Sequence, residues 1–129
     1  MKKYSLFVMI AAVLVAAGCS KSDSNTDTGI KTIRYDFTTT NAADYSIQAI
    51  ADTLVYTENA TALTWSKTVT VTGSDSAFLT VFPPAAWLGT TNEADVTVKI
   101  TVNDVEKASA NAHFIAIDRP NGLKVGASY

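Results

Sequence analysis

The stretch Asp95-Val96-Thr97-Val98-Lys99-Ile100-Thr101-Val102 decides the fold of this 129-residue chain. Its apolar side chains fall on every second residue, and the residues between them are charged or carry hydroxyl groups. Because successive side chains of a β-strand point to opposite faces, this alternation predicts a strand with one face in a core and the other in water. Asn103-Asp104 tolerates positive φ, which predicts a two-residue hairpin turn into the strand that begins at Val105.

The same period of two runs through most of the chain from Ile30 onward. Turn-forming residues interrupt it about every ten residues, and no sustained apolar repeat at helical spacing follows Ile30. Leu63–Thr72 is a clear example, with Lys67 as the exception on its apolar side, which indicates an edge strand, a bulge or a strand end. We predict an all-β fold, a single immunoglobulin-like β-sandwich of about seven antiparallel strands.

Two runs are apolar on both faces, and the second of them marks the end of the predicted domain. Ala77–Phe82 should lie in the interior or be covered on both sides, and Pro83-Pro84 ends it because proline cannot donate to a strand ladder. Phe114–Ile117 is the last apolar run, and the residues after it stop the pattern. We therefore assign residues 30–118 to the sandwich and residues 119–129 to a C-terminal tail.

The N-terminus carries a different kind of signal. Lys2 and Lys3 precede an apolar run, Leu6–Ala17, and small residues stand directly before Cys19. The run is shorter than the roughly 20 residues that a helix needs to cross a bilayer core. We predict that residues 1–18 are a secretory signal peptide that is removed.

Val15-Ala16-Ala17-Gly18-Cys19 resembles the lipobox of bacterial lipoproteins, in which the cysteine is acylated and becomes the new N-terminus. Ala16 stands where Leu is more usual, and an ordinary signal peptide with a bystander cysteine is the alternative. The resemblance implies attachment to a membrane through lipid on Cys19, since two or more acyl chains anchor a protein stably. Residues 19–29 would then be the acylated cysteine and a flexible tether, because Ser20–Gly29 is polar and lacks an apolar anchor. Ser20 resembles the residues that allow sorting to the outer membrane of the bacterial envelope rather than retention at the inner one.

Charge and cysteine content exclude several classes of protein. The chain has a net charge of −2, and removal of Lys2 and Lys3 leaves eight basic against twelve acidic side chains. That balance offers no basic face for nucleic acid and no polybasic patch for anionic lipid. With Cys19 as the only cysteine, the folded part has no thiol and no disulfide. The roughly 100 residues after Gly29 suffice for one domain.

Few residues suit catalysis or metal binding. His113 is the only histidine, and we expect it to be a satisfied or half-exposed strand residue rather than a catalytic base. One histidine and no further thiol cannot build a zinc site. Asp36, Asp44 and Asp52 lack the spacing of a calcium loop, so we expect solvated turn residues and caps. No phosphate-binding glycine loop or nucleophile elbow is present, and we expect no enzyme, no metal and no cofactor.

Aromatic and hydroxyl side chains leave room for a binding module. Trp65 lies on an apolar strand face and is expected in the core. Trp87 follows two prolines, and either plugs an end of the sandwich, which we favour, or is displayed to stack on a sugar or to anchor a protein partner. The hydroxyl row Thr64–Thr72 is expected on the solvent side of its strand, with hydrogen bonding to a polar ligand as the alternative.

Two triplets resemble an acceptor pattern for O-linked glycans. Asp52-Thr53-Leu54 and Asp75-Ser76-Ala77 match the sequence Asp, then Ser or Thr, then an apolar residue, found on exported proteins of some Gram-negative gut bacteria. The resemblance makes Thr53 and Ser76 candidate glycosylation sites.

Four short blocks resemble a family of small membrane proteins of the MmpS type. They are Ile33-Arg34-Tyr35-Asp36-Phe37, Ala43-Asp44-Tyr45-Ser46-Ile47, Leu63-Thr64-Trp65-Ser66-Lys67 and Ile100-Thr101-Val102-Asn103-Asp104. The resemblance implies a small immunoglobulin-like sandwich outside the inner membrane that assists large lipid-exporting transporters. This chain departs from the family in having a lipobox in place of a spanning helix, Asp104 where the family's hairpin tends to have Gly, and no cysteine pair in the domain.

Taken together, these features predict a lipid-anchored envelope protein whose sandwich is a non-catalytic interaction or accessory module, with a protein of an envelope transport complex as its partner. A glycan- or ligand-binding module at the cell surface is the alternative.

Overall fold

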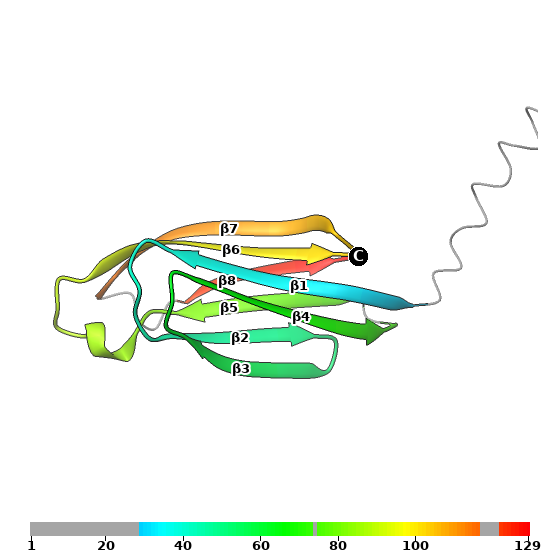
Figure 1. The fold of residues 1–129 in the computed structure, drawn as a ribbon, viewed down its shortest axis with the longest axis horizontal. Coiled ribbons are helices and arrows are strands. Elements are labelled where there is room, and N and C mark those ends of the chain that lie inside the picture. The colour runs from blue at the N-terminus through cyan, green and yellow to red at the C-terminus, as the bar shows by residue number, and fades with distance from the viewer. Residues whose placement is uncertain (1–28, 74, 117–121) are drawn as a thin grey trace, which may run out of the picture.

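The computed structural model describes residues 29–73, 75–116 and 122–129, which form two packed antiparallel β-sheets (Figure 1). Sheet A has the strand order β4-β1-β6-β7, and sheet B has the order β3-β2-β5-β8. The strands are β1 (Ile30–Thr39), β2 (Tyr45–Ala51), β3 (Leu54–Ala60), β4 (Thr64–Thr72), β5 (Ser76–Phe82), β6 (Glu93–Val102), β7 (Val105–Ile115) and β8 (Leu123–Ser128). The predicted all-β sandwich is confirmed.

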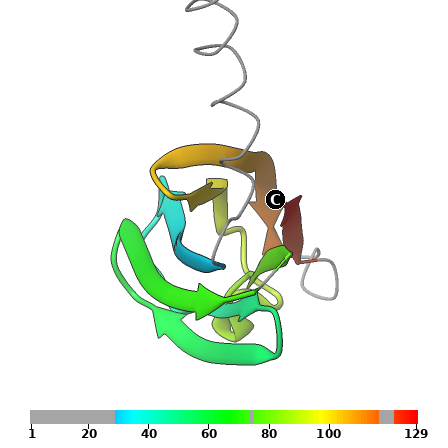
Figure 2. The same ribbon diagram turned by 90° about the vertical axis from the view of Figure 1, so that its right-hand side faces the viewer.

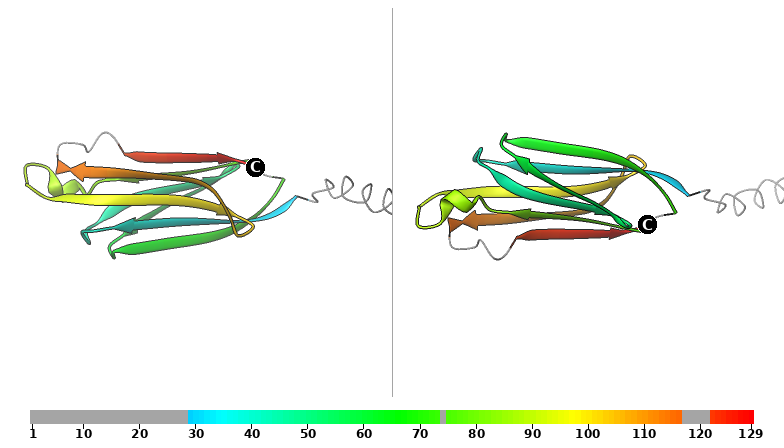
Figure 3. Two further views of the ribbon diagram at one scale, coloured as in Figure 1. Left: turned by 90° about the horizontal axis from the view of Figure 1, so that it is seen from above. Right: turned by 90° about the horizontal axis from the view of Figure 1, so that it is seen from below.

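The strands lie along the long axis of the molecule (Figure 3). The strand β1 begins at one end, which faces the viewer in Figure 2, and the chain also ends there. The short 3-10 helix η2 (Ala85–Trp87) lies at the opposite end (Figure 3). Within the described residues, no helix is long and apolar enough to cross a membrane. The predicted signal peptide, Cys19 and nearly all of the predicted tether lie outside the described residues.

The core lies between the sheets and follows the alternation predicted for the strands. In β6 the five apolar residues Ala94, Val96, Val98, Ile100 and Val102 are all buried, and the intervening side chains are exposed or half-buried. The five largest fully buried side chains come from the inner strands β1 and β2: Ile33, Tyr35, Phe37, Tyr45 and Ile47. The Tyr35 hydroxyl donates a 2.6 Å hydrogen bond to the carbonyl oxygen of Ile50, which joins the two layers through the core.

The structure has eight strands rather than about seven, and the difference lies at the C-terminus. The range 119–129 was predicted to be a tail, yet β8 pairs with β5 over six residues. Val125 and Ala127 of β8 are buried in the core. Leu123, Val125 and Ala127 are the only three inward residues of this short strand, and Gly126 weakens the alternation, which is why the pattern alone missed it.

Several local predictions are also tested by the structure. The hairpin turn is confirmed, because Asn103 and Asp104 have φ values of 48° and 64° and connect Val102 with its partner Val105. The end of the short apolar run Leu54–Thr57 predicts a loop over Glu58–Thr61, and this is wrong, since β3 continues to Ala60.

Lys67 lies on an edge strand, which is one of the three alternatives that its charge predicted. The strand β4 is an edge strand of sheet A, so the Lys67 ammonium reaches the side of the sandwich although its residue points inward. The two-faced strand β5 lies between β2 and β8, as predicted for the interior of a sheet.

Candidate functional site

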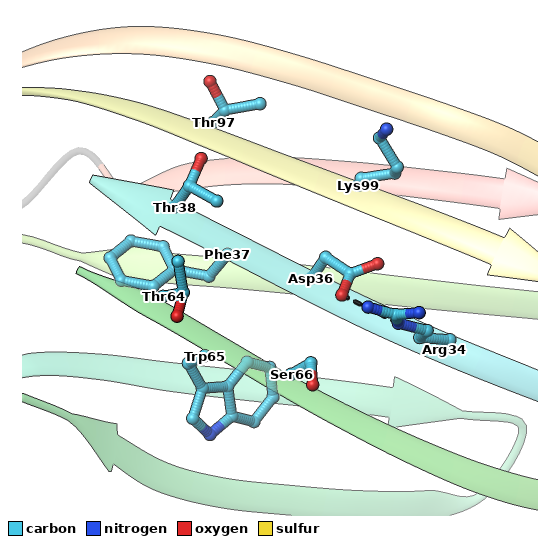
Figure 4. Close-up of a pocket in the computed structure, with 9 residues that line it drawn as sticks. All are labelled: Arg34, Asp36, Phe37, Thr38, Thr64, Trp65, Ser66, Thr97 and Lys99. Atoms are coloured by element: carbon cyan, nitrogen blue, oxygen red, sulfur yellow. Dashed lines mark hydrogen bonds and ion pairs between the residues drawn. The ribbon is translucent and has the colours of Figure 1, made fainter. Parts of the chain in front are cut away.

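A hollow on the outer face of sheet A has a volume of about 640 Å³. It extends over the three neighbouring strands β4, β1 and β6 (Figure 4). We call it the sheet A groove, and seven residues with polar side chains line it: Arg34, Asp36, Thr38, Thr64, Ser66, Thr97 and Lys99. Phe37 and Trp65 complete the lining.

Strand register brings these polar side chains together. Thr38 of β1 is opposite Thr64 of β4 on one side and Thr97 of β6 on the other. Two residues along β1, Asp36 is in the same way flanked by Ser66 and Lys99. Because residues two apart on a strand share a face, the two rows lie side by side on the outer surface. The result is a patch of hydroxyl groups beside a patch of charges.

The charges in the groove are arranged in pairs of opposite sign. Arg34 Nε donates a 2.9 Å hydrogen bond to Asp36 Oδ1, and the two side chains are 58% and 23% exposed. At the rim, Lys99 Nζ lies 3.0 Å from Glu106 Oε2. The hydrogen bond from Lys99 lowers the pKa of the Glu106 carboxyl group. The groove therefore presents hydrogen-bond donors and acceptors together with side chains of both charges. Because these charges are paired, the groove has no strong net electrostatic field.

Sequence reasoning identified only part of this groove. The hydroxyl row that begins at Thr64 was recognised as a surface able to bind a polar ligand, but Arg34, Thr38, Thr97 and Lys99 were not assigned to any site. Their side chains converge only because β1 pairs with both β4 and β6. The pairing with β6 joins residues more than 50 positions apart and the pairing with β4 joins residues more than 25 positions apart, which strand periodicity does not specify.

Trp65 is half-buried and packs against the core, as its position on an apolar strand face predicted. Its indole Nε1 donates a 3.2 Å hydrogen bond to Glu58 Oε2 on β3. Lys67 forms an ion pair with the other oxygen of Glu58 and lies 4.7 Å from the ring centroid of Tyr56. The hydrogen bond from Lys67 is the largest influence that lowers the pKa of Glu58. These four side chains, which we call the edge clasp, connect the edge strands of the two sheets.

Trp87 is 4% exposed and lies in η2 at the end of the sandwich opposite the start of β1. Its ring meets Tyr45 edge-on, with a centroid separation of 5.8 Å and an interplanar angle of 72°. The neighbouring Leu88 is 60% exposed. The indole thus takes the plug position and presents no open ring face for stacking.

His113 lies on the exposed face of β7 beside two carboxylates. Its Nδ1 is 2.8 Å from Asp95 Oδ1, and its Nε2 is 3.4 Å from Glu93 Oε2. The hydrogen bond with Asp95 is the largest influence raising the pKa of this histidine. Both ring nitrogens therefore face an acidic side chain.

The three aspartates considered for calcium are not brought together. Asp36 lies on the face of sheet A, Asp44 in the loop after β1, and Asp52 in the turn between β2 and β3. In residues 29–73, 75–116 and 122–129, no cluster of three or more His, Cys, Asp or Glu side chains could hold a metal ion.

The two candidate glycosylation residues lie near the same end of sheet B. Thr53 is exposed in the turn between β2 and β3, and Ser76 is the half-buried first residue of β5. The two segments are in contact, since the Asp52 backbone N–H donates a 3.2 Å hydrogen bond to the Ser76 carbonyl oxygen. The lipidation candidate Cys19 lies outside the described residues.

Comparison with known proteins does not place the chain in a family. No family model matches the sequence, and no curated protein matches it.

Proposed function

We propose that this chain is an acylated bacterial envelope lipoprotein whose β-sandwich is a non-catalytic interaction module. The sequence supports the anchor through the lipobox resemblance at Cys19 and the polar segment that follows it. The structure supports a binding role through the sheet A groove, which is the observation that carries this part of the proposal. A groove of about 640 Å³ with convergent polar groups has the size of ordinary ligand sites, roughly 300 to 1,000 Å³.

A protein of an envelope transport complex is the first partner class that we propose, on the strength of the MmpS-type resemblance. The C-terminal end of β1 and η2 lie away from the start of β1, where the predicted tether would join (Figure 3), and the groove lies on the outer face of sheet A. A flexible tether of about ten residues has a reach of roughly 15 to 20 Å, so an anchored domain can turn these surfaces toward a partner.

The anchor is tested by the intact mass of the protein purified from a bacterial host. Acylation predicts cleavage before Cys19 and a mass increased by lipid, together with recovery in the membrane fraction. The matched variant Cys19→Ser should lose the added mass and leave the membrane fraction. A mature protein with a bare thiol at Cys19 would contradict the anchor.

The interaction role is tested by affinity capture from detergent-solubilised envelope of the native host. We expect one envelope complex to be recovered in defined stoichiometry with the acylated protein. Recovery of the same complex with an unrelated lipoprotein, or of no complex under any condition, would contradict a protein partner.

A glycan- or ligand-binding module is the second candidate function, and a different observation favours it. The polar side chains of the groove suit a polar ligand, whereas Trp87, the residue first considered for stacking on a sugar, is covered. Binding of this kind would use sheet A rather than the end of the sandwich.

A further inference from the structure

The sheet A groove contains several polar groups with capacity to bind a ligand. Within the described part of the chain, the hydroxyls of Thr38, Thr64 and Thr97 take part in no hydrogen bond with protein, and Asp36 uses only Oδ1. Asp36 lies on the central strand of the groove and is the least exposed of its three charged side chains, at 23% against 58% for Arg34 and 42% for Lys99. A ligand in the groove would therefore meet a carboxylate at its centre and hydroxyls beside it.

The backbone of the groove excludes one common mode of recognition. The strand β1 is paired with β4 on one side and β6 on the other, so the hydrogen-bonding groups of its backbone are used in the two ladders. An extended peptide binds a sheet by adding to an open edge, which the middle of this face does not offer. Recognition here must come from side chains alone.

The charges and the polarity of the groove restrict the chemical class of the ligand further. Arg34 is paired with Asp36 and Lys99 with Glu106, so a polyanion such as nucleic acid would meet partly neutralised cations. An apolar ligand requires predominantly apolar walls, whereas seven of the nine lining residues contribute polar side chains. Hydroxyls, one carboxylate and two cations instead offer both donors and acceptors at close spacing. That combination matches a ligand that is itself rich in hydroxyl groups.

The extent of the groove suits a short chain rather than a single small molecule. Three neighbouring strands span about 10 Å across the sheet, and the residues from Arg34 to Thr38 span about 13 Å along it. Water held by exposed hydroxyls can be replaced by ligand hydroxyls with little loss of hydrogen bonding.

From these observations we propose that the sheet A groove binds a segment of an oligosaccharide. In this site Asp36 accepts hydrogen bonds from sugar hydroxyls, and Arg34 and Lys99 donate hydrogen bonds to sugar oxygens. The hydroxyls of Thr38, Thr64 and Thr97 can donate or accept. This inference rests on the second candidate function and assigns it a site and a class of ligand. Because the Trp65 indole donates toward Glu58 and Trp87 is buried, the site has no fully open aromatic platform, and binding in the millimolar range is expected.

The test is a titration of the full chain, purified in a zwitterionic detergent that carries no sugar headgroup. Amide NMR spectra are recorded with maltotriose, cellotriose, N-acetylchitotriose and trigalacturonate, each at millimolar concentration. At least one trisaccharide should produce saturable shifts centred on Asp36, Thr38 and Thr97. No saturable shift with any of the four, or shifts centred on η2, would overturn the proposal.

Two groove variants and two matched controls make the result specific. Asp36→Ala should weaken binding roughly tenfold, since it removes hydrogen bonds to a charged group, and Thr38→Val should weaken it a few-fold. The controls Thr70→Val and Thr101→Val change the same residue type on the same face of sheet A outside the groove, and should bind as the parent does. Equal losses in groove and control variants, with all spectra retaining the folded dispersion, would refute a site in the groove.

This experiment is independent of the tests of the anchor and of the protein partner. Failure of the titration leaves the anchored interaction module intact, and a bare thiol at Cys19 leaves the titration unaffected.

Discussion

Several polar side chains in this protein connect one strand with the next strand along the chain. Glu58 of β3 binds Trp65 and Lys67 of β4, and His113 of β7 contacts Asp95 of β6. Tyr35 crosses the core to the backbone of Ile50, and burial raises the pKa of its hydroxyl well above the usual range. Exposed ion pairs contribute less than about 1 kcal/mol each to folding, so their main effect is on titration.

The imidazole of His113 should titrate above its ordinary pKa of 6.5. A raised pKa means that the favourable contacts of the cation are fully present below pH 6.5 and are lost as the pH rises through the folded-state pKa. Asp95→Asn should return the pKa, followed by NMR of the ring protons, most of the way to the ordinary value. Glu93→Gln should cause a smaller decrease, and equal effects of the two variants would contradict the geometry.

The edge clasp should make the stability of the domain depend on pH in the acidic range. The pKa of Glu58 is lowered, so its ion pair contributes above the ordinary pKa of 4.5 and this contribution is lost as the pH falls through the folded-state pKa. Glu58→Gln keeps an acceptor for Trp65 but removes the charge, and should reduce the difference between urea midpoints measured at neutral and at acidic pH. The control Asp104→Asn, in the exposed hairpin turn, should preserve the parent's difference. An unchanged difference in Glu58→Gln would show that the ion pair is not formed.

The strands differ in how strongly their sequence predicts them. The strand β6 has a regular alternation over its full length, and its five inward residues are all buried. In contrast, β8 has Gly126 on its outer face, where an added Cβ would lie 2.6 Å from the Phe78 ring. The missing side chain makes room for that ring on the two-faced strand β5 and at the same time hides the strand from a pattern search.

If β8 is an integral strand, Val125→Ala should destabilise the domain by about 1 to 2 kcal/mol, because it removes methyl groups from the core. The measurement is the free energy of unfolding from urea titration followed by circular dichroism. Ser128→Ala is the control, since Ser128 is exposed on the same strand, and it should change the stability by less than about 0.5 kcal/mol. Equal changes in the free energy of unfolding in the two variants would indicate that β8 behaves as a tail and contributes nothing to the core.

The assembled sandwich has two different ends and one open polar face. The end with η2 is closed by Trp87 packed on Tyr45, while the other end receives the start of β1. The groove lies between these ends on the face of sheet A. An anchored domain of this shape would have its closed end and its polar face available to other molecules in the envelope.

The contribution of Trp87 to closing the η2 end of the sandwich can be measured from the free energy of unfolding. Trp87→Phe should lower the free energy of unfolding by about 1 to 2 kcal/mol, because the smaller ring leaves part of the end unfilled. Leu88→Ala, at the exposed neighbouring residue, should change it by less than about 0.5 kcal/mol. A neutral Trp87→Phe, or acrylamide quenching of Trp87 as strong as that of free tryptophan, would contradict the buried position.

Local patterns were sufficient to predict the fold class, most strands and the Asn103-Asp104 turn, and they gave an edge position as one of three alternatives for the strand that contains Lys67. Each of these depends on residues that are neighbours in sequence, since strand alternation and turn chemistry act over two to ten residues. The absence of any disulfide in the folded part follows from the cysteine count in the same way.

Tertiary structure decided which strands lie side by side when they are not joined by a short turn, and with that the position of the sheet A groove and the edge clasp. Many strand orders would bury the same alternating residues, so the alternation does not specify that β1 pairs with both β4 and β6. The groove around Asp36 follows from that pairing, and the edge clasp follows from the positions of β3 and β4 at the edges of the two sheets. The physical reason is that hydrophobic burial is largely indifferent to strand order, whereas polar side chains act only within hydrogen-bonding distance.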